Sequence, residues 1–301
     1  TVGWSEVTLY LPSALCGVAG LLLFPWLVAR LAGRSVALCF AWLFALSPCL
    51  AFYSRILRPY PMVLFFGFSA LLCLALWVRT GRQHLLAAYA TAGILAVYFH
   101  VYAAIPVFAP LAALFFWVRL KAFPEAPWVS PRRLLVTATI MLGLLVLLLG
   151  PAHWQNPWWK NMLGTSRVTA VGLWEFLSLL AGTHFTVSKL AFAATAAFGF
   201  HAAIRCDPRS GLVWASVLGA FAVLMVFATQ EGMHAAIQIA RYNIILFPVV
   251  LLLVAYGFDS ALSHFPFPAW RPPLGAALAA SLLAGGPVFR TYSQPNNFMH
   301  H

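Results

Sequence analysis

Long apolar runs separated by short polar or charged segments recur along the whole of this chain. Reading the runs between charged residues gives about ten candidate helices: 7–29, 35–53, 59–78, 84–99, 101–118, 134–150, 186–204, 211–229, 241–258 and 273–288. Most approach the roughly 17–25 residues that a helix needs to cross a bilayer. Only His100 separates 84–99 from 101–118, a pattern that fits either a hairpin or one long bent segment. The pattern predicts an all-α, polytopic integral membrane protein of about ten transmembrane helices.

Composition agrees with this prediction. Of the 301 residues, 63% are hydrophobic and 8% are charged, and the mean hydropathy is +0.89. The net charge of +12 would suggest nucleic acid as the partner of a soluble protein, but basic loops are also typical of membrane proteins. We therefore expect membrane lipids and no nucleic acid as partners. The five cysteines show no CxxC spacing, and so indicate neither a disulfide framework nor a zinc site.

We expect one transmembrane domain over residues 1–288, with an extracytoplasmic loop at 151–185. Residues 289–301 form a polar tail that could begin a further extracytoplasmic segment. The chain starts with Thr1, and its first span follows an amphipathic lead-in rather than a signal peptide, so we expect a truncated N-terminus. In the loop, apolar residues at helical spacing around Trp174 and Phe176 predict a helix lying in the membrane interface. An aromatic belt explains that pattern as well as contact with a substrate does.

The distribution of Lys and Arg predicts the orientation of the chain. If the loops after the odd-numbered spans face the cytoplasm, that side holds eleven of the eighteen basic residues: Arg30, Arg34, Arg79, Arg82, Arg119, Lys121, Arg132, Arg133, Arg205, Arg209 and Arg271. The other face holds Arg55, Arg58, Lys160, Arg167, Lys189, Arg241 and Arg290. The segment SRILRPYP, residues 54–61, then lies outside the cytoplasm.

Arginines on the face that this rule disfavours require a reason, because an unpaired guanidinium is costly near hydrocarbon. Arg55 and Arg58 are three residues apart and would share a face if the second span continued through them, with Pro59 in the first turn of the next helix. Two guanidinium forks suit a phosphate or pyrophosphate. The alternative is that both arginines snorkel to ordinary lipid phosphates.

Two further motifs fall at the same face. FHVY places His100 and Tyr102 at the outer end of the fourth span, and QIARYNIILFP places Arg241 and Tyr242 at the start of a late span. Of the six acids in the chain, three are expected outside: Glu6, Glu175 and Glu231. The sequence shows no paired carboxylates, no Ser/His/Asp set and no HExxH motif.

Three segments together resemble a known family. LSPCLAFYSRILRPYPMVLFF, LAVYFHVYAAIPVFAPL and ARYNIILFPVVLLLVAYGF are similar, in order and spacing, to segments of the GT-C glycosyltransferases of the protein-mannosyltransferase and RgtA/B/C/D-like group. The likeness runs from about Leu11 to Phe258. It implies an enzyme that moves a sugar from an undecaprenyl- or dolichyl-phosphate carrier to a glycan, lipid or protein acceptor. The reaction would take place on the extracytoplasmic face, with the bacterial inner membrane as the expected location.

The resemblance also implies roles for particular residues. Arg55, Arg58 and Arg241 would bind the carrier phosphate, and four aromatic or imidazole side chains would shape the cavity: Tyr60, His100, Tyr102 and Tyr242. The family's catalytic acid lies in the first extracytoplasmic loop, which places it upstream of Thr1 and leaves Glu6 and His100 as weak candidates. Relatives often have an acid where this chain has Ile56 and Leu57. The lipid-linked sugar donor is the only cofactor implied, and a role for a divalent metal is left open.

Two other classes compete with this interpretation. A transporter or flippase for an anionic lipid or solute would also use outer arginines, although such proteins tend to show inverted repeats, and none is found here. A scaffold without chemistry would leave the convergent arginines and the aromatic loop unexplained.

Overall fold

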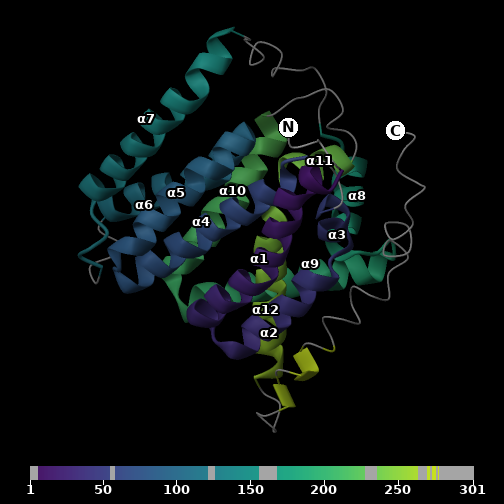
Figure 1. Cartoon of the computed structure of the whole chain (residues 1–301). Helices are drawn as coiled ribbons and strands as arrows, with labels where there is room; N and C mark the ends of the chain where they lie inside the picture. Colours follow the sequence, from purple (N-terminus) through teal and green to yellow (C-terminus); the bar gives the residue numbers. More distant parts are fainter. Residues whose placement is uncertain are drawn as a thin grey trace.

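The computed structural model describes residues 6–54, 58–120, 126–155, 168–227, 236–263, 270–271, 273–275 and 277, and these residues contain helices and turns but no strand (Figure 1). The helices are α1 (Glu6–Ala32), α2 (Arg34–Leu46), α3 (Pro48–Ser54), α4 (Tyr60–Thr80), α5 (Gln83–Phe99), η1 (Val101–Ala103), α6 (Ala104–Arg119), α7 (Pro131–Gln155), α8 (Ala170–Ala181), α9 (Thr186–Cys206), α10 (Pro208–Phe227), α11 (Ala236–Tyr242) and α12 (Leu246–Leu262). The all-α prediction is confirmed for this part of the chain.

Six of these helices are long and apolar enough to cross a membrane: Tyr10–Ala32, Tyr60–Thr80, Val101–Arg119, Pro131–Pro151, Thr186–Cys206 and Pro208–Met225. The bent pair α2 and α3 would make a seventh, and α5, α8 and α12 are shorter apolar helices. These lengths indicate an integral membrane protein. The prediction of about ten spans is not confirmed, and the tenth run, 273–288, lies almost wholly outside the described residues.

Two expected spans are broken, so their predicted boundaries are wrong. The run 35–53 divides at Ser47, and α2 and α3 are bent by 57°. Ser47 is extended, with φ −62° and ψ 115°, because the ring of Pro48 disfavours helical geometry in the residue before it. The run 241–258 divides as well: α11 ends at Tyr242, and α12 begins at Leu246 after a turn.

The segment around His100 is a hairpin, one of the two alternatives that the sequence allowed. His100 has an extended backbone, with φ −158° and ψ 111°, which ends α5. The Tyr89 hydroxyl donates to the Val107 carbonyl oxygen over 2.7 Å. Because these residues lie well away from the break on either side, α5 and α6 must fold back on each other.

Side-chain contacts hold several of the segments between helices together at one end of the bundle. We call it the arginine end, after Arg30, Arg79, Arg82 and Arg133. Arg79 donates to the Leu31 carbonyl oxygen, which joins the α1–α2 and α4–α5 connections. The Trp128 indole donates to the Val78 carbonyl oxygen over 3.1 Å, which brings the segment before α7 to the same place. The α3–α4 connection and His100 lie at the other end of α4 and α5, which we call the tyrosine end.

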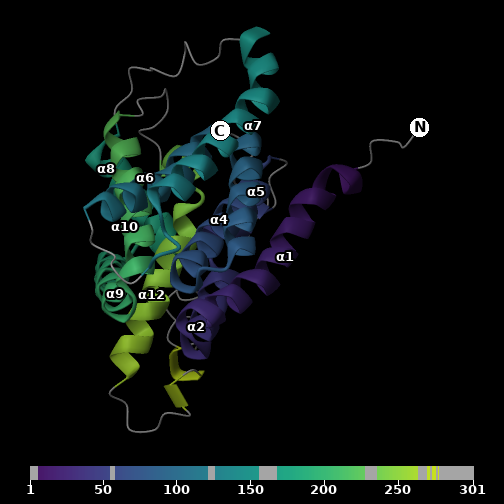
Figure 2. The ribbon, with the colours of Figure 1, turned by 90° about the vertical axis from the view of Figure 1, so that its left-hand side faces the viewer.

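Burial differs strongly between the helices. In the 18-residue apolar stretch of α4, 83% is buried inside the protein, whereas only 22% of the corresponding stretches of α7 and α9 is buried. The helix α4 is therefore central, whereas α7 presents leucines and valines on its outer surface, as a lipid-facing helix would. Figure 2 shows the first half of α1 projecting away from the other helices.

Candidate functional site

An aromatic cluster occupies the tyrosine end and joins residues from four separate elements. Tyr53 of α3 contacts Tyr60 of α4, with ring centroids 5.3 Å apart, and Tyr60 lies 6.0 Å from His100. His100 lies 5.7 Å from Tyr242 of α11, and Tyr242 lies 4.8 Å from Tyr102 of η1. These five residues are called the aromatic cluster below. Its rings form one connected set across the end of the bundle.

Local breaks in the helices place these side chains. Tyr53 lies next to the end of α3, Tyr60 begins α4, and His100 stands between α5 and η1. Tyr242 is the last residue of α11, and the turn behind it is held by the Asn243 side-chain amide, which donates to the Ile239 carbonyl oxygen over 2.9 Å. Each ring therefore projects from a helix terminus, where a membrane helix meets its polar boundary.

Arg241 supplies a partly buried positive charge beside the cluster. Its guanidinium carbon lies 4.7 Å from the centre of the Tyr242 ring, and Nη2 donates to the Tyr242 hydroxyl over 2.5 Å. Its Nε is buried and has no hydrogen-bond partner among the residues that the structure describes. A buried donor of a charged group without a partner is costly, so this geometry favours an acceptor beyond the residues that the structure describes.

Arg58 and Arg241 approach the cluster together. Both guanidinium groups interact electrostatically with the Tyr60 side chain, although Arg58 precedes α4 and Arg241 ends α11. Arg58 itself is exposed. Two guanidinium groups around one tyrosine can bind a phosphate from two sides.

His100 is held in its neutral form. Burial, and then the nearby charge of Arg241, lower its pKa from the ordinary value of 6.5 to about 4. At pH 7 the imidazole therefore has one nitrogen that accepts a hydrogen bond and one that donates. It can orient a hydroxyl group, but a pKa of about 4 makes it a weak base.

An apolar cleft of about 370 Å³ leads to the cluster. Its walls come from α1, α2, α3 and α4, and they include Leu21, Phe44 and Leu64. Tyr53 and Tyr60 are part of both the cleft and the aromatic cluster. A ligand with an apolar tail in this cleft would present its head to Tyr53 and Tyr60.

Most of the residues that the sequence singled out for substrate binding meet here: Arg58, Tyr60, His100, Tyr102, Arg241 and Tyr242. Arg55 lies outside the described residues. Glu6 is the first residue of α1.

The condition for a helical face shared by Arg55 and Arg58 is not met at Arg58, because α3 ends at Ser54 and Arg58 lies in a bend before α4. One detail of the prediction is wrong. Arg241 and Tyr242 end the short helix α11 instead of opening a span, because the chain turns at Asn243.

Sequence reasoning missed Tyr53 as a member of the aromatic cluster, and it placed Lys189 on this face without a partner. Tyr53 stands directly before SRILRPYP, and its position there was the available signal. Lys189 is 3% exposed, and its ammonium group lies 3.1 Å from the Ser178 hydroxyl and 3.9 Å from the centre of the Trp174 ring. This contact joins α9 to α8. The helix predicted around Trp174 and Phe176 is present as α8.

Three acidic side chains that the structure describes lie outside the elements that bear the rings of the cluster. Asp207 caps the start of α10, where its carboxylate accepts from the Arg209 amide and the Ser210 hydroxyl. Asp259 is near the end of α12, and Glu175 is exposed on α8. Within the described residues, no group of three or more His, Cys, Asp or Glu side chains could hold a metal ion.

A scan of the chain against protein-family models found no match, and searches of curated proteins and of solved structures found none either. The GT-C resemblance therefore stays a prediction.

Proposed function

We propose that this protein is a GT-C-like membrane glycosyltransferase that moves a sugar from a polyprenyl-phosphate carrier to an acceptor hydroxyl. One observation carries the proposal: an apolar cleft reaches the aromatic cluster at Tyr53 and Tyr60, and beside the cluster stands Arg241, whose buried Nε has no partner among the described residues. An apolar chain next to an anionic head is the chemistry of a lipid-linked sugar. The acceptor is a glycan, a lipid or a protein.

The two arginines would bind the carrier phosphate. In the transfer, the acceptor oxygen forms a bond to the anomeric carbon while the bond between that carbon and the phosphate oxygen breaks. The polyprenyl phosphate leaves with the bonding electrons, and a base takes the acceptor proton. Arg241 and Arg58 would stabilise the negative charge that grows on the leaving phosphate.

The rings and the imidazole would position the sugar. Tyr60, Tyr102 and Tyr242 offer flat faces and hydroxyl groups, a combination that suits a ring bearing both apolar and polar edges. His100, neutral at pH 7, would exchange hydrogen bonds with a sugar hydroxyl. We assign it an orienting role, since its low pKa does not suit strong base catalysis.

The distribution of charge supports an extracytoplasmic site. Among the described basic residues, the arginine end includes Arg30, Arg34, Arg79, Arg82, Arg132 and Arg133, whereas Arg58 and Arg241 lie at the tyrosine end. Basic residues favour the cytoplasmic side. The aromatic cluster would then face the periplasm of a bacterial inner membrane.

The direct test is sugar transfer by purified protein in liposomes with radiolabelled undecaprenyl-phosphate sugars. Arg241→Ala is expected to lower the transfer rate by about 10²–10³-fold, because one preorganised contact to a developing charge contributes that much. Arg241→Lys should recover part of it, since a lysine provides the charge but not the planar fork. Arg132→Ala, at an exposed arginine of α7, is the matched control and should keep full activity.

The same liposomes separate the competing function. A fluorescent polyprenyl phosphate added to one leaflet reports translocation, and translocation without sugar transfer would favour a flippase. A wild-type rate of sugar transfer in Arg241→Ala would refute the binding of the carrier phosphate by Arg241.

A further inference from the structure

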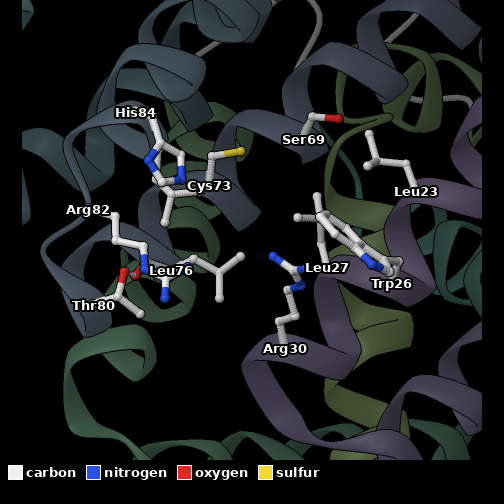
Figure 3. A pocket seen from close by; sticks show the side chains of 11 residues that line it. Leu23, Trp26, Leu27, Arg30, Ser69, Cys73, Leu76, Thr80, Arg82 and His84 are labelled. Atoms are coloured by element: carbon white, nitrogen blue, oxygen red, sulfur yellow. Dashed lines mark hydrogen bonds between the residues drawn. The ribbon is translucent and has the colours of Figure 1, made fainter.

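A second cleft lies at the arginine end, at the opposite end of α4 from the aromatic cluster. It measures about 650 Å³ and is lined by α1, α4 and the start of α5 (Figure 3). This cleft is larger than the one at the tyrosine end, and it is walled by a different set of residues. The sugar-transfer proposal gives it no role.

Two guanidinium groups and an imidazole line this cleft. Arg30 comes from the last turn of α1, Arg82 from the α4–α5 connection and His84 from the start of α5. The Arg30 guanidinium carbon lies 3.8 Å from the centre of the Trp26 ring, which orients it. In the part of the chain that the structure describes, neither arginine has a carboxylate partner. The mouth of the cleft is therefore complementary to an anion.

The body of the cleft is apolar. Leu23 and Leu27 of α1 face Cys73 and Leu76 of α4 in the same cavity (Figure 3). From Ser69 to Thr80 the wall spans about 16 Å at a rise of 1.5 Å per residue. A cleft of that depth accommodates a stretch of hydrocarbon as well as a headgroup. A free inorganic anion would leave the apolar part of the cleft empty.

Ser69 gives an independent sign that the cleft takes a ligand. Its side chain is 7% exposed, it lines the cavity, and its hydroxyl has no hydrogen-bond partner within the described segments of the chain. A buried hydroxyl normally finds a partner, so an ester or glycerol oxygen inside the cleft would satisfy it.

We propose that this cleft binds one anionic phospholipid of the surrounding membrane. Arg30 and Arg82 contact its phosphate, His84 lies beside the headgroup, and an acyl chain lies between α1 and α4. The lipid would link α1 to the central helix α4 along the apolar part of the cleft. This site is independent of the sugar-transfer proposal, because it shares no lining residue with the aromatic cluster.

The test uses the full chain, purified in a neutral detergent, with phosphatidylglycerol or phosphatidylcholine added in increasing amounts. Tm is measured at each lipid concentration. We expect phosphatidylglycerol to raise Tm more than phosphatidylcholine does, and the difference to shrink as salt is added. Arg30→Gln and Arg82→Gln should each weaken the apparent affinity for phosphatidylglycerol about fivefold. Arg132→Gln, at an exposed arginine outside the cleft, should leave that affinity unchanged.

A second variant separates the cleft from general surface charge. Ser69→Leu keeps every charge but fills the apolar part, and is expected to lower the affinity for phosphatidylglycerol while the unliganded protein still folds. Equal responses to the two lipids in the wild type would overturn the proposal, and so would equal losses in Arg132→Gln and Arg82→Gln. If inorganic phosphate alone reproduced the full rise in Tm, the ligand would be a soluble anion and the lipid assignment would be wrong.

Discussion

Adding one methyl group to Gly199 should separate two helices that pack backbone to backbone. A Cβ at Gly199 of α9 would lie 1.7 Å from the Leu253 carbonyl oxygen of α12, and a Cβ at Gly257 of α12 would lie 2.3 Å from the Thr195 carbonyl oxygen of α9. Such mutual approach by small residues is a common means of association between membrane helices. The atoms in the way belong to backbone, so no side chain can rotate to make room.

The magnitude follows from this distance. Real Cβ contacts do not fall below 3.0 Å, so Gly199→Ala requires the helices to move apart by about 1.3 Å at this point. Overfilling a packed site usually costs about 1–3 kcal/mol, and we expect about 3 kcal/mol because two helix backbones must shift. In a chain of this size that is a fall in Tm of roughly 5 °C or more.

Function should suffer as well. Arg241 and Tyr242 precede α12 by one turn, so a displaced α12 moves the arginine and the ring. A misplacement of about 1 Å can lower a reaction rate by about 10²-fold. Gly199→Ala is therefore expected to impair the proposed sugar transfer, although residue 199 lies outside the proposed site.

The assay is thermal unfolding in detergent beside sugar transfer in liposomes. Gly219→Ala is the matched control: it lies in α10, and a Cβ there meets nothing within 4 Å, so its higher helix propensity should leave Tm equal or higher. An unchanged Tm in Gly199→Ala would show that the α9–α12 contact is looser than the structure has it, and would refute this reasoning.

Two other predictions concern buried polar groups. Because the pKa of His100 is about 4 in the folded protein and 6.5 when exposed, its burial should destabilise the fold progressively as pH falls from 6.5 to 4. His100→Gln should flatten that part of the curve of Tm against pH, and an unaltered curve would contradict the pKa assignment. Ser178→Ala would leave the buried Lys189 ammonium without its hydrogen-bond partner and should cost about 1–3 kcal/mol. The double variant Ser178→Ala/Lys189→Met also removes the charge and should recover most of that loss. Urea titration in mixed micelles measures the free energy of unfolding of both variants.

The sequence identified six of the residues at the tyrosine end because they stand at the ends of apolar runs. A run long enough to cross a membrane has its ends at the two faces, so alternate ends lie at the same face whatever the packing. That is why Tyr60, His100 and Tyr242 could be expected on one side. The same reasoning missed the breaks between α2 and α3 and between α11 and α12, because local turns at Ser47 and Asn243 do not interrupt hydrophobicity.

The apolar pattern by itself determined that the chain is helical and suited to a membrane, because hydrogen bonding in hydrocarbon leaves the backbone few alternatives. Only the tertiary structure decided which side chains meet. The contact of Tyr53 with Tyr60, the approach of Gly199 to Leu253 and the cleft between Arg30 and Arg82 each join separate helices. Such contacts depend on how helix surfaces fit together, and in a chain so uniformly apolar hydrophobicity does not distinguish one helix face from another.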